Sequence, residues 1–283
     1  MLFRTWPDEA PAGTEWRRKK TMTPVVNEIL GSADYFILLM FRVGGLIVPS
    51  PIFGRVNIPA MAKIGLTAAI SYLFFIVFPQ TAAITYSTLM GFALLCASEV
   101  LLGIALAFIT NVFFSLTSYT AGQIIDMQIG FGIANVYDVQ NNTQAPVMGN
   151  ILNLMLLLLF FAIDGHHKLI EMVYLTIERI PVGALTFTSN IGLVALEIFI
   201  KAFLIGVMMA LPILASGLTL EIAFGMMMRA VPQIHMFVVG IPLKMLVGII
   251  VFTATLPVYA GFSSRIFEEM FIGIELMFAA FVG

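Results

Sequence analysis

The sequence is poor in charged residues and has only one cysteine. Asp, Glu, Lys and Arg make up 11% of the 283 residues, whereas hydrophobic residues make up 60%. Globular domains carry about 25% charged residues, so this chain cannot cover a soluble surface. The single cysteine, Cys96, excludes an intramolecular disulfide and most cysteine-based metal sites; we interpret it as a small apolar residue inside a hydrophobic run. The net charge of -2 says nothing about nucleic acid, but there is no extended basic patch, and we predict no nucleic acid partner.

Long stretches of the chain contain no charged residue. A bilayer core takes about 20 apolar helical residues to cross, and backbone groups in lipid must be satisfied within the segment. The sequence therefore predicts an all-α integral membrane protein, in contact with lipid, with about six long hydrophobic helices. The charge-free stretches are Ile64–Ser98, Val100–Ile125, Val139–Ile163, Ala202–Leu220 and Met245–Ser264.

Prolines, glycines and polar clusters mark where these helices end. Kinks are expected at Pro212 and Pro257. A polar tail over residues 1–21 precedes the helices, and the sequence leaves open whether Met1 or Met22 is the first residue of the protein. A short, mostly apolar tail is expected over Phe271–Gly283. The expected helices are Tyr35–Val48, Ala60–Phe78, Ser87–Thr120, Pro146–Ile163, Ile191–Phe224 and Val238–Met270.

Two connections between the expected helices are notable. Gln123–Gln144 is polar, glycine-bearing and long for a linker, and such loops are often functional. The other connection contains Pro232 and Gln233 and separates the last two helices as the turn of a helical hairpin would.

Several charges lie within or at the ends of apolar segments. A charge at the bilayer centre costs about 2.5–3.5 kcal/mol on insertion scales, so these side chains are expected to face another helix, a subunit or water. Lys201, Lys244 and Arg229 are also compatible with snorkelling from helix ends. Whether Arg42 and Glu99 pair with each other is left open by the sequence. The predicted interface charges are Arg42, Glu99, Glu221 and Arg229.

The sequence contains no pattern typical of an enzyme. There is no set of nucleophile, base and acid, and Gly130-Phe131-Gly132 lacks the third glycine of a nucleotide-binding loop. His166 and His167 follow Asp164, and Glu171 comes four residues after His167, which is metal-ligand spacing, but no further ligands are evident. We therefore predict no catalytic residues, no metal and no cofactor.

An ordered set of segments resembles the R-subunit family of the flagellar type III export gate, which is related to the T subunit of virulence injectisomes. The resemblance covers roughly residues 28–275. It is carried by Phe41-Arg42-Val43, Pro49–Gly54, Ile58-Pro59, Lys63–Leu66, Glu99–Gly103, Ala121-Gly122-Gln123, Met127–Phe131, Asp164–His167, Ile180–Gly183 and Arg229–Lys244.

The resemblance implies a place in an assembly. Residues 22–185 would be similar to a P subunit and residues 186–283 to a Q-type hairpin. The implied partners are FliP and FliQ in a hetero-oligomer, with FlhB and FlhA nearby and unfolded flagellar proteins as cargo. The implied location is the bacterial inner membrane at the flagellar basal body. The segment after the third helix, residues 123–144, would close the pore, with Met127, Ile129, Gly130, Phe131 and Gly132 as gate residues. The alternative is a surface loop whose Phe131 only packs onto a helix.

Three alternatives stay open at the sequence level. The first is the equivalent T subunit of a virulence injectisome. The second is a stand-alone small-solute transporter, which the kink prolines and intramembrane charges favour but the absence of a visible internal repeat disfavours. The third, an intramembrane enzyme, is disfavoured by the missing catalytic residues. A transporter is expected to purify alone, whereas an export-gate subunit is expected to need P and Q subunits.

Overall fold

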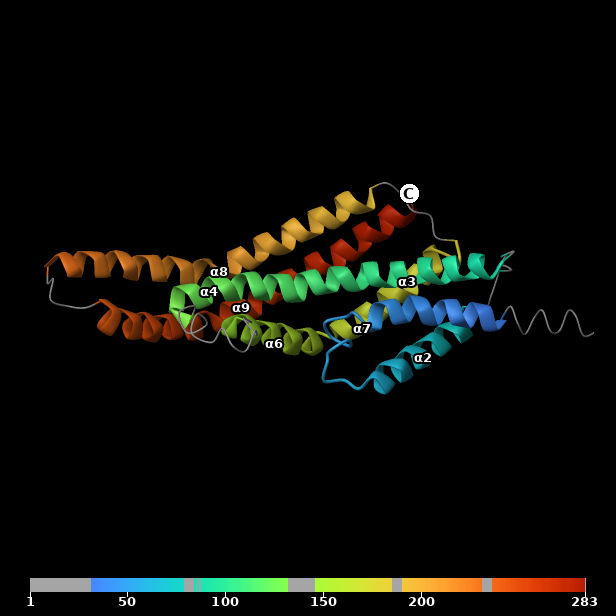
Figure 1. The fold of residues 1–283 in the computed structure, drawn as a ribbon, viewed down its shortest axis with the longest axis horizontal. Helices are drawn as coiled ribbons and strands as arrows, with labels where there is room; N and C mark the ends of the chain where they lie inside the picture. Colours follow the sequence, from blue (N-terminus) through green and yellow to red (C-terminus); the bar gives the residue numbers. More distant parts are fainter. Residues whose placement is uncertain are drawn as a thin grey trace, which may run out of the picture.

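Helices are the only regular secondary structure in the described part of the chain. The computed structural model describes residues 32–78, 84, 86, 88–131, 146–184, 190–230 and 236–282, and the predicted all-α class is confirmed (Figure 1). The polar tail lies outside the described residues. In chain order, the helices are residues 32–47, α2 (Ala60–Val77), α3 (Leu89–Asn111), the π-helical turn η1 (Val112–Leu116), α4 (Thr117–Ile129), α6 (Val147–Ala162), α7 (Gly165–Arg179), α8 (Ile191–Ala230) and α9 (Met236–Val282).

Fewer helices are long enough to cross a membrane than the sequence predicted. Four described helices meet the length and hydropathy of a span, or five if α6 and α7 count together; the prediction of about six is corrected to four or five. The helix over residues 32–47 has only sixteen described residues. The expected fourth helix, Pro146–Ile163, is found as α6, and α7, which the sequence did not predict, leaves it after Asp164 at an angle of 72°.

The helix α3 continues through η1 into α4, which makes one apolar rod of 41 residues, Leu89–Ile129. The sequence predicted a loop from Gln123 onward; the structure corrects its start, since α4 runs to Ile129. Gly130 ends α4 with φ of 99°, the left-handed conformation that glycine adopts most readily at helix ends. Residues 132–145 lie outside the described residues.

The helices α8 and α9 are the longest elements and lie side by side as a hairpin (Figure 1). Pro212 lies inside α8, and Figure 1 shows that helix changing direction near its middle. Pro257 lies inside α9 together with Pro242. The predicted apolar tail over Phe271–Gly283 is wrong as a tail, because α9 continues through Val282. Its side chains Phe278 and Phe281 are buried in the core, which stabilises the extra turns.

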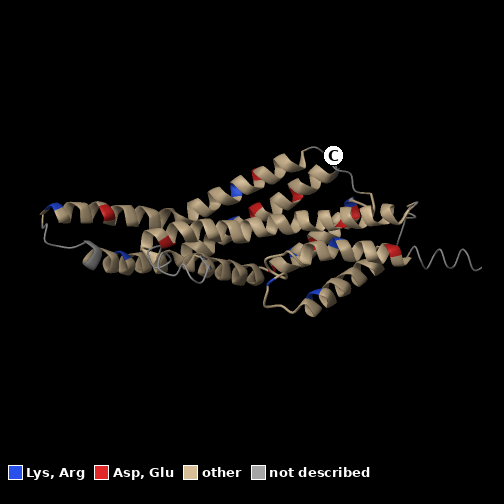
Figure 2. Ribbon diagram, viewed as in Figure 1, with Lys and Arg blue, Asp and Glu red and all other residues tan. Residues whose placement is uncertain are grey.

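The core lies where α4 meets α6, α8 and α9. One cluster of buried side chains joins residues from the N-terminal helices with residues of the hairpin. The division into a P-like and a Q-like part therefore concerns resemblance and stays a prediction. Charged residues are few along the described helices (Figure 2).

Candidate functional site

The two charges deepest in the chain form an ion pair. The Arg42 side chain, from the helix over residues 32–47, meets Glu99 of α3, and both are 0% exposed. Nε of Arg42 donates to Oε2 of Glu99, while Nη2 donates to Oε1 at 3.0 Å. Such a two-bond contact fixes both side chains, as the planar guanidinium allows.

The same pair holds the C-terminal end of α7. Nη1 of Arg42 donates to the carbonyl oxygens of Thr176 at 3.2 Å and Ile180 at 3.0 Å. Oε1 of Glu99 accepts a hydrogen bond from the backbone N–H of Gly183 at 2.8 Å. The Thr176 carbonyl also accepts a hydrogen bond from the Ile180 backbone N–H at 2.9 Å. Arg42 therefore adds a second donor there and supplies one to the Ile180 carbonyl, just past the end of α7, where carbonyls lack partners within the helix. We call these five residues the ion-pair node.

Two glycines bring the node together. A Cβ on Gly45 would lie 2.6 Å from the Val100 carbonyl oxygen, and a Cβ on Gly103 would lie 2.8 Å from Gly45 Cα. The two helices therefore touch backbone to backbone about one turn from Arg42 and Glu99. Small residues allow this close approach between helices, and it lets the two side chains meet.

The remaining predicted interface charges lie on the hairpin and are more accessible. Glu221 of α8 accepts a hydrogen bond from the ammonium group of Lys244 on α9, with the two side chains 42% and 18% exposed. Arg229 is exposed in the last turn of α8, so its burial at an interface stays a prediction that requires a partner. Pro232 and Gln233 lie outside the described residues.

The predicted gate residues gather at the end of α4. Met127 is exposed, Ile129 is fully buried, and Gly130 is the residue that ends the helix. Phe131 is partly buried and packs against the core cluster. Gly132 lies outside the described residues. The structure therefore brings four of the five predicted gate residues to one helix end, and their gating role stays a prediction.

Asp126 is a structural residue that the sequence reasoning missed. It is buried, and its Oδ1 accepts a hydrogen bond from the Met148 backbone N–H in the first turn of α6 at 3.2 Å. A carboxylate at this position satisfies a donor that is free at any helix start. Pro146 is the N-cap residue of α6 and has no side chain that can accept a hydrogen bond from the helix. This proline was the feature of the sequence that could have indicated an N-cap supplied by another segment. One turn earlier, Gly122 contacts Gly149 closely.

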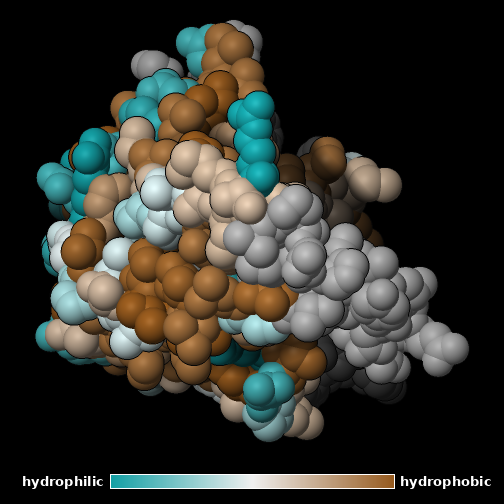
Figure 3. Space-filling view, turned by 90° about the vertical axis from the view of Figure 1, so that its left-hand side faces the viewer, coloured by the Kyte–Doolittle hydropathy of each residue, from teal (hydrophilic) through white to brown (hydrophobic). Residues whose placement is uncertain are grey.

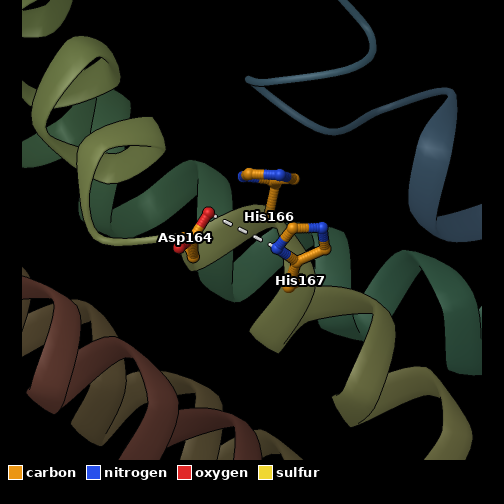
Figure 4. A group of neighbouring side chains, drawn as sticks. All are labelled: Asp164, His166 and His167. Atoms are coloured by element: carbon orange, nitrogen blue, oxygen red, sulfur yellow. Dashed lines mark ion pairs between the residues drawn. The ribbon is translucent and has the colours of Figure 1, made fainter.

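The corner between α6 and α7 brings three possible metal ligands together (Figure 4), and Glu171, whose spacing from His167 was noted in the sequence, is not among them. Ligand atoms of Asp164, His166 and His167 all lie within 4.8 Å of one another. Nδ1 of His167 lies 3.4 Å from a carboxylate oxygen of Asp164, and both side chains are mostly exposed. Asp164 has a positive φ of 56°, as the sharp bend requires. A metal site normally has a buried supporting shell around its ligands, and two of these three side chains face outward; the absence of a metal stays a prediction.

Tyr86 connects the segment before α3 to the first described helix. Its hydroxyl donates to Oδ2 of Asp34 at 2.7 Å. This hydrogen bond raises the pKa of Tyr86 above its usual value, because the phenol is held as the donor.

Comparison with known proteins identifies the family. The sequence pattern of the bacterial export proteins, family 1, matches residues 33–270. The chain is 35% identical over 233 residues to the flagellar biosynthetic protein FliR of Escherichia coli (strain K12), covering 82% of this chain and 88% of that protein. It is 31% identical over 230 residues to FliR of Bacillus subtilis (strain 168), covering 80% and 87%.

A more distant relative covers even more of the chain. FliR of Aquifex aeolicus (strain VF5) is 25% identical over 253 residues, covering 88% of this chain and 97% of that protein. The region that matches the family, residues 33–270, includes the ion-pair node, the end of α4 and the hairpin up to residue 270. The chain therefore belongs to the bacterial export proteins of family 1, as a membrane protein of the FliR family of flagellar export components.

Proposed function

We propose that this chain is a structural and gating subunit of the flagellar protein export pore. In this proposal it assembles with FliP and FliQ, adjoins FlhB and FlhA, and lies in the bacterial inner membrane at the flagellar basal body. Its cargo is unfolded flagellar protein. It is a conduit, without catalytic residues or cofactors. The three relatives named above are flagellar proteins, which favours a flagellum over a virulence injectisome.

The observation that carries the proposal is the apolar surface that the chain leaves uncovered. Of the most apolar 18 residues of α2 and of α9, only 17% are buried in each case. On the distal part of α8, Ile222 and Met226 are each 65% exposed. Figure 3 looks onto the end at which the hairpin projects and shows broad hydrophobic areas there. Apolar areas of this size indicate contact with lipid or with other helices.

A pore that passes unfolded chains must also be closed at rest. A hydrophobic constriction closes a pore by excluding water. The end of α4 offers such a group, because Phe131 directly follows the helix end at Gly130 and is only partly buried in this chain. The φ of 99° at Gly130 fixes a turn there, so that Phe131 leaves the axis of α4. This position supports a gating role.

The test measures ion leakage across the inner membrane together with assembly. Replacing Phe131 by Gly is expected to raise leakage and slow growth while the chain still co-purifies with FliP and FliQ. Phe131→Leu keeps the apolar bulk and is expected to stay near the wild-type leakage. Phe199→Ala, which changes an exposed phenylalanine on α8, is the matched control. Wild-type leakage in assembled Phe131→Gly complexes would show that Phe131 does not close the pore.

A further inference from the structure

The end of α4 lies in a cleft between the two helices of the hairpin. Helix α4 packs against both α8 and α9, and Figure 1 shows it ending beside them. The side chain of Gln128 enters this cleft. A small cavity there is lined by Gln128, by Ile213, Ser216, Gly217 and Leu220 of α8, and by Lys244, Val247 and Gly248 of α9.

Gly248 of α9 lies in close contact with the gate segment, by which we mean the described predicted gate residues and the residue between them, Met127–Phe131. A Cβ on Gly248 would lie 2.7 Å from Cγ1 of Ile129 and 3.3 Å from its Cα and Cβ. Ile129 is fully buried, so it has little room to shift. On the opposite helix, Gly217 leaves the space that the Gln128 side chain occupies. Only a residue without a side chain fits at Gly248 while Ile129 stays in place.

Shape, and not hydrogen bonding, holds this contact. Among the described residues, the buried Oε1 of Gln128 has no hydrogen-bond partner. The ion pair between Glu221 and Lys244 joins α8 to α9 beside the same cavity. This pair connects the two helices of the hairpin and does not include a residue of α4. The end of α4 can therefore leave the cleft without breaking a charged bond to the hairpin; the hydrogen bond that Asp126 of the same turn accepts from the Met148 N–H runs to α6.

We propose that Gly217 and Gly248 form a seat, the glycine seat, that positions the gate segment in its closed state. Ile129 lies two residues before Phe131, and Gly130 between them is fixed as the helix end. Displacing Ile129 therefore displaces Phe131. The hairpin acts on the pore through this contact, and the end of α4 leaves the seat when cargo passes. The inference rests on the proposed gating function of Phe131; the glycines are positioning residues.

A first experiment tests the seat with a compensating pair. Gly248→Ala is expected to push Ile129 out and raise ion leakage to the level of Phe131→Gly, with co-purification of FliP and FliQ unchanged. The double variant Gly248→Ala/Ile129→Ala removes the clashing Cγ1 and is expected to leak less than Gly248→Ala alone. Gly261→Ala is the matched control on α9, because a Cβ there meets nothing within 4 Å. Lowered co-purification of Gly248→Ala with FliP and FliQ would show a merely structural role, and wild-type leakage in assembled Gly248→Ala complexes would overturn the seat.

A second experiment tests release from the seat. In a Cys96→Ala background, cysteines at 129 and 248 would have Cβ atoms about as close as the 3.3 Å found here, near the roughly 3.5–4.5 Å of disulfides. Oxidation of the assembled complex is expected to form the cross-link and stop export of flagellar proteins, and reductant is expected to restore export. The two single-cysteine variants are the controls.

The outcomes separate this inference from the proposed function. Export that continues with the cross-link formed would overturn release from the seat, and failure to cross-link in assembled complexes would overturn the seat itself. Neither result affects the leakage assay of Phe131→Gly, which tests the gating function of Phe131 independently. If Phe131→Gly does not leak, the proposed gating function fails, whatever the cross-link shows.

Discussion

The ion-pair node and the glycine seat are two ways of holding a helix end. At the node, Arg42 and Glu99 bind the end of α7 through charged hydrogen bonds and are fully buried. At the seat, Gly217 and Gly248 hold the end of α4 through close contact alone. The node lies between N-terminal elements, whereas the seat joins α4 to the hairpin.

The difference indicates which end is fixed and which can move. Breaking the node would leave a buried charge without its partner, which costs about 3–5 kcal/mol. Leaving the seat costs mainly apolar contact area, at about 25 cal/mol per Å². The node is therefore suited to fix the scaffold, and the seat is suited to a segment that changes position.

The largest effect is expected at the node. Arg42→Met leaves the Glu99 carboxylate buried and removes the donors to Thr176 and Ile180, so we expect a loss of stability of about 3–5 kcal/mol. Thermal unfolding in detergent and recovery of the FliP–FliQ complex measure it. Lys201→Met is the control, because its pair with Glu197 is exposed and worth about 0–1 kcal/mol.

The double change Arg42→Met/Glu99→Met sharpens this prediction. Removing both charges often costs less than removing one, so the double variant is expected to be more stable than Arg42→Met. If Arg42→Met unfolds at the wild-type temperature, the node does not fix the scaffold and the contrast with the seat disappears.

An intermediate effect is expected from Gly103→Ala. Its Cβ would lie 2.8 Å from Gly45 Cα and would push the helix over residues 32–47 away from α3, at a cost of about 1–3 kcal/mol. Gly65→Ala in α2 is the matched control, since a Cβ there meets nothing within 4 Å and alanine favours a helix by about 1 kcal/mol. The expected order of unfolding temperatures is Gly65→Ala at or above wild type and Gly103→Ala below it; the reverse order would contradict the close contact.

The smallest effect is expected at the ion pair of the hairpin. Glu221 and Lys244 are partly exposed, and such pairs contribute about 0–1 kcal/mol. A double-mutant cycle with Glu221→Gln and Lys244→Met, measured by thermal unfolding, is expected to give a coupling energy in that range. A coupling as large as the loss at Arg42 would mean that the hairpin is held as rigidly as the node.

Much of the helix pattern could be predicted from the charge-free runs and the prolines. The helix expected over Ala60–Phe78 is found over Ala60–Val77, and the start predicted at Ile191 is the start of α8. The end of α4 was missed because polar residues there were interpreted as a loop. Asp126 is in fact buried, with its hydrogen-bond partner at Met148. Such a partner becomes visible only when the chain is folded.

The candidate site was predicted in its parts but not in its connections. The sequence identified Arg42 and Glu99 as charges that are costly to place in an apolar segment. Their pairing could not be predicted, because a single sequence does not show which residues 57 positions apart come into contact. The gate residues came from the resemblance to a family, and their contact with Gly248 depends on how α4 and α9 pack. Glycines that allow close contact look the same in a sequence as glycines that meet nothing.

The length of the hairpin has a consequence for where the chain can sit. At 1.5 Å per residue, the 40 residues of α8 extend about 60 Å, twice the roughly 30 Å of a bilayer's hydrocarbon layer. Both ends of α8 carry exposed apolar side chains, among them Leu193 and Met226. Unless α8 lies strongly tilted, one of these ends stands outside the lipid, in water or the headgroup layer, where only another protein can cover it. When α8 crosses the bilayer along its normal, the hydrocarbon layer is too thin to cover the whole length of the helix.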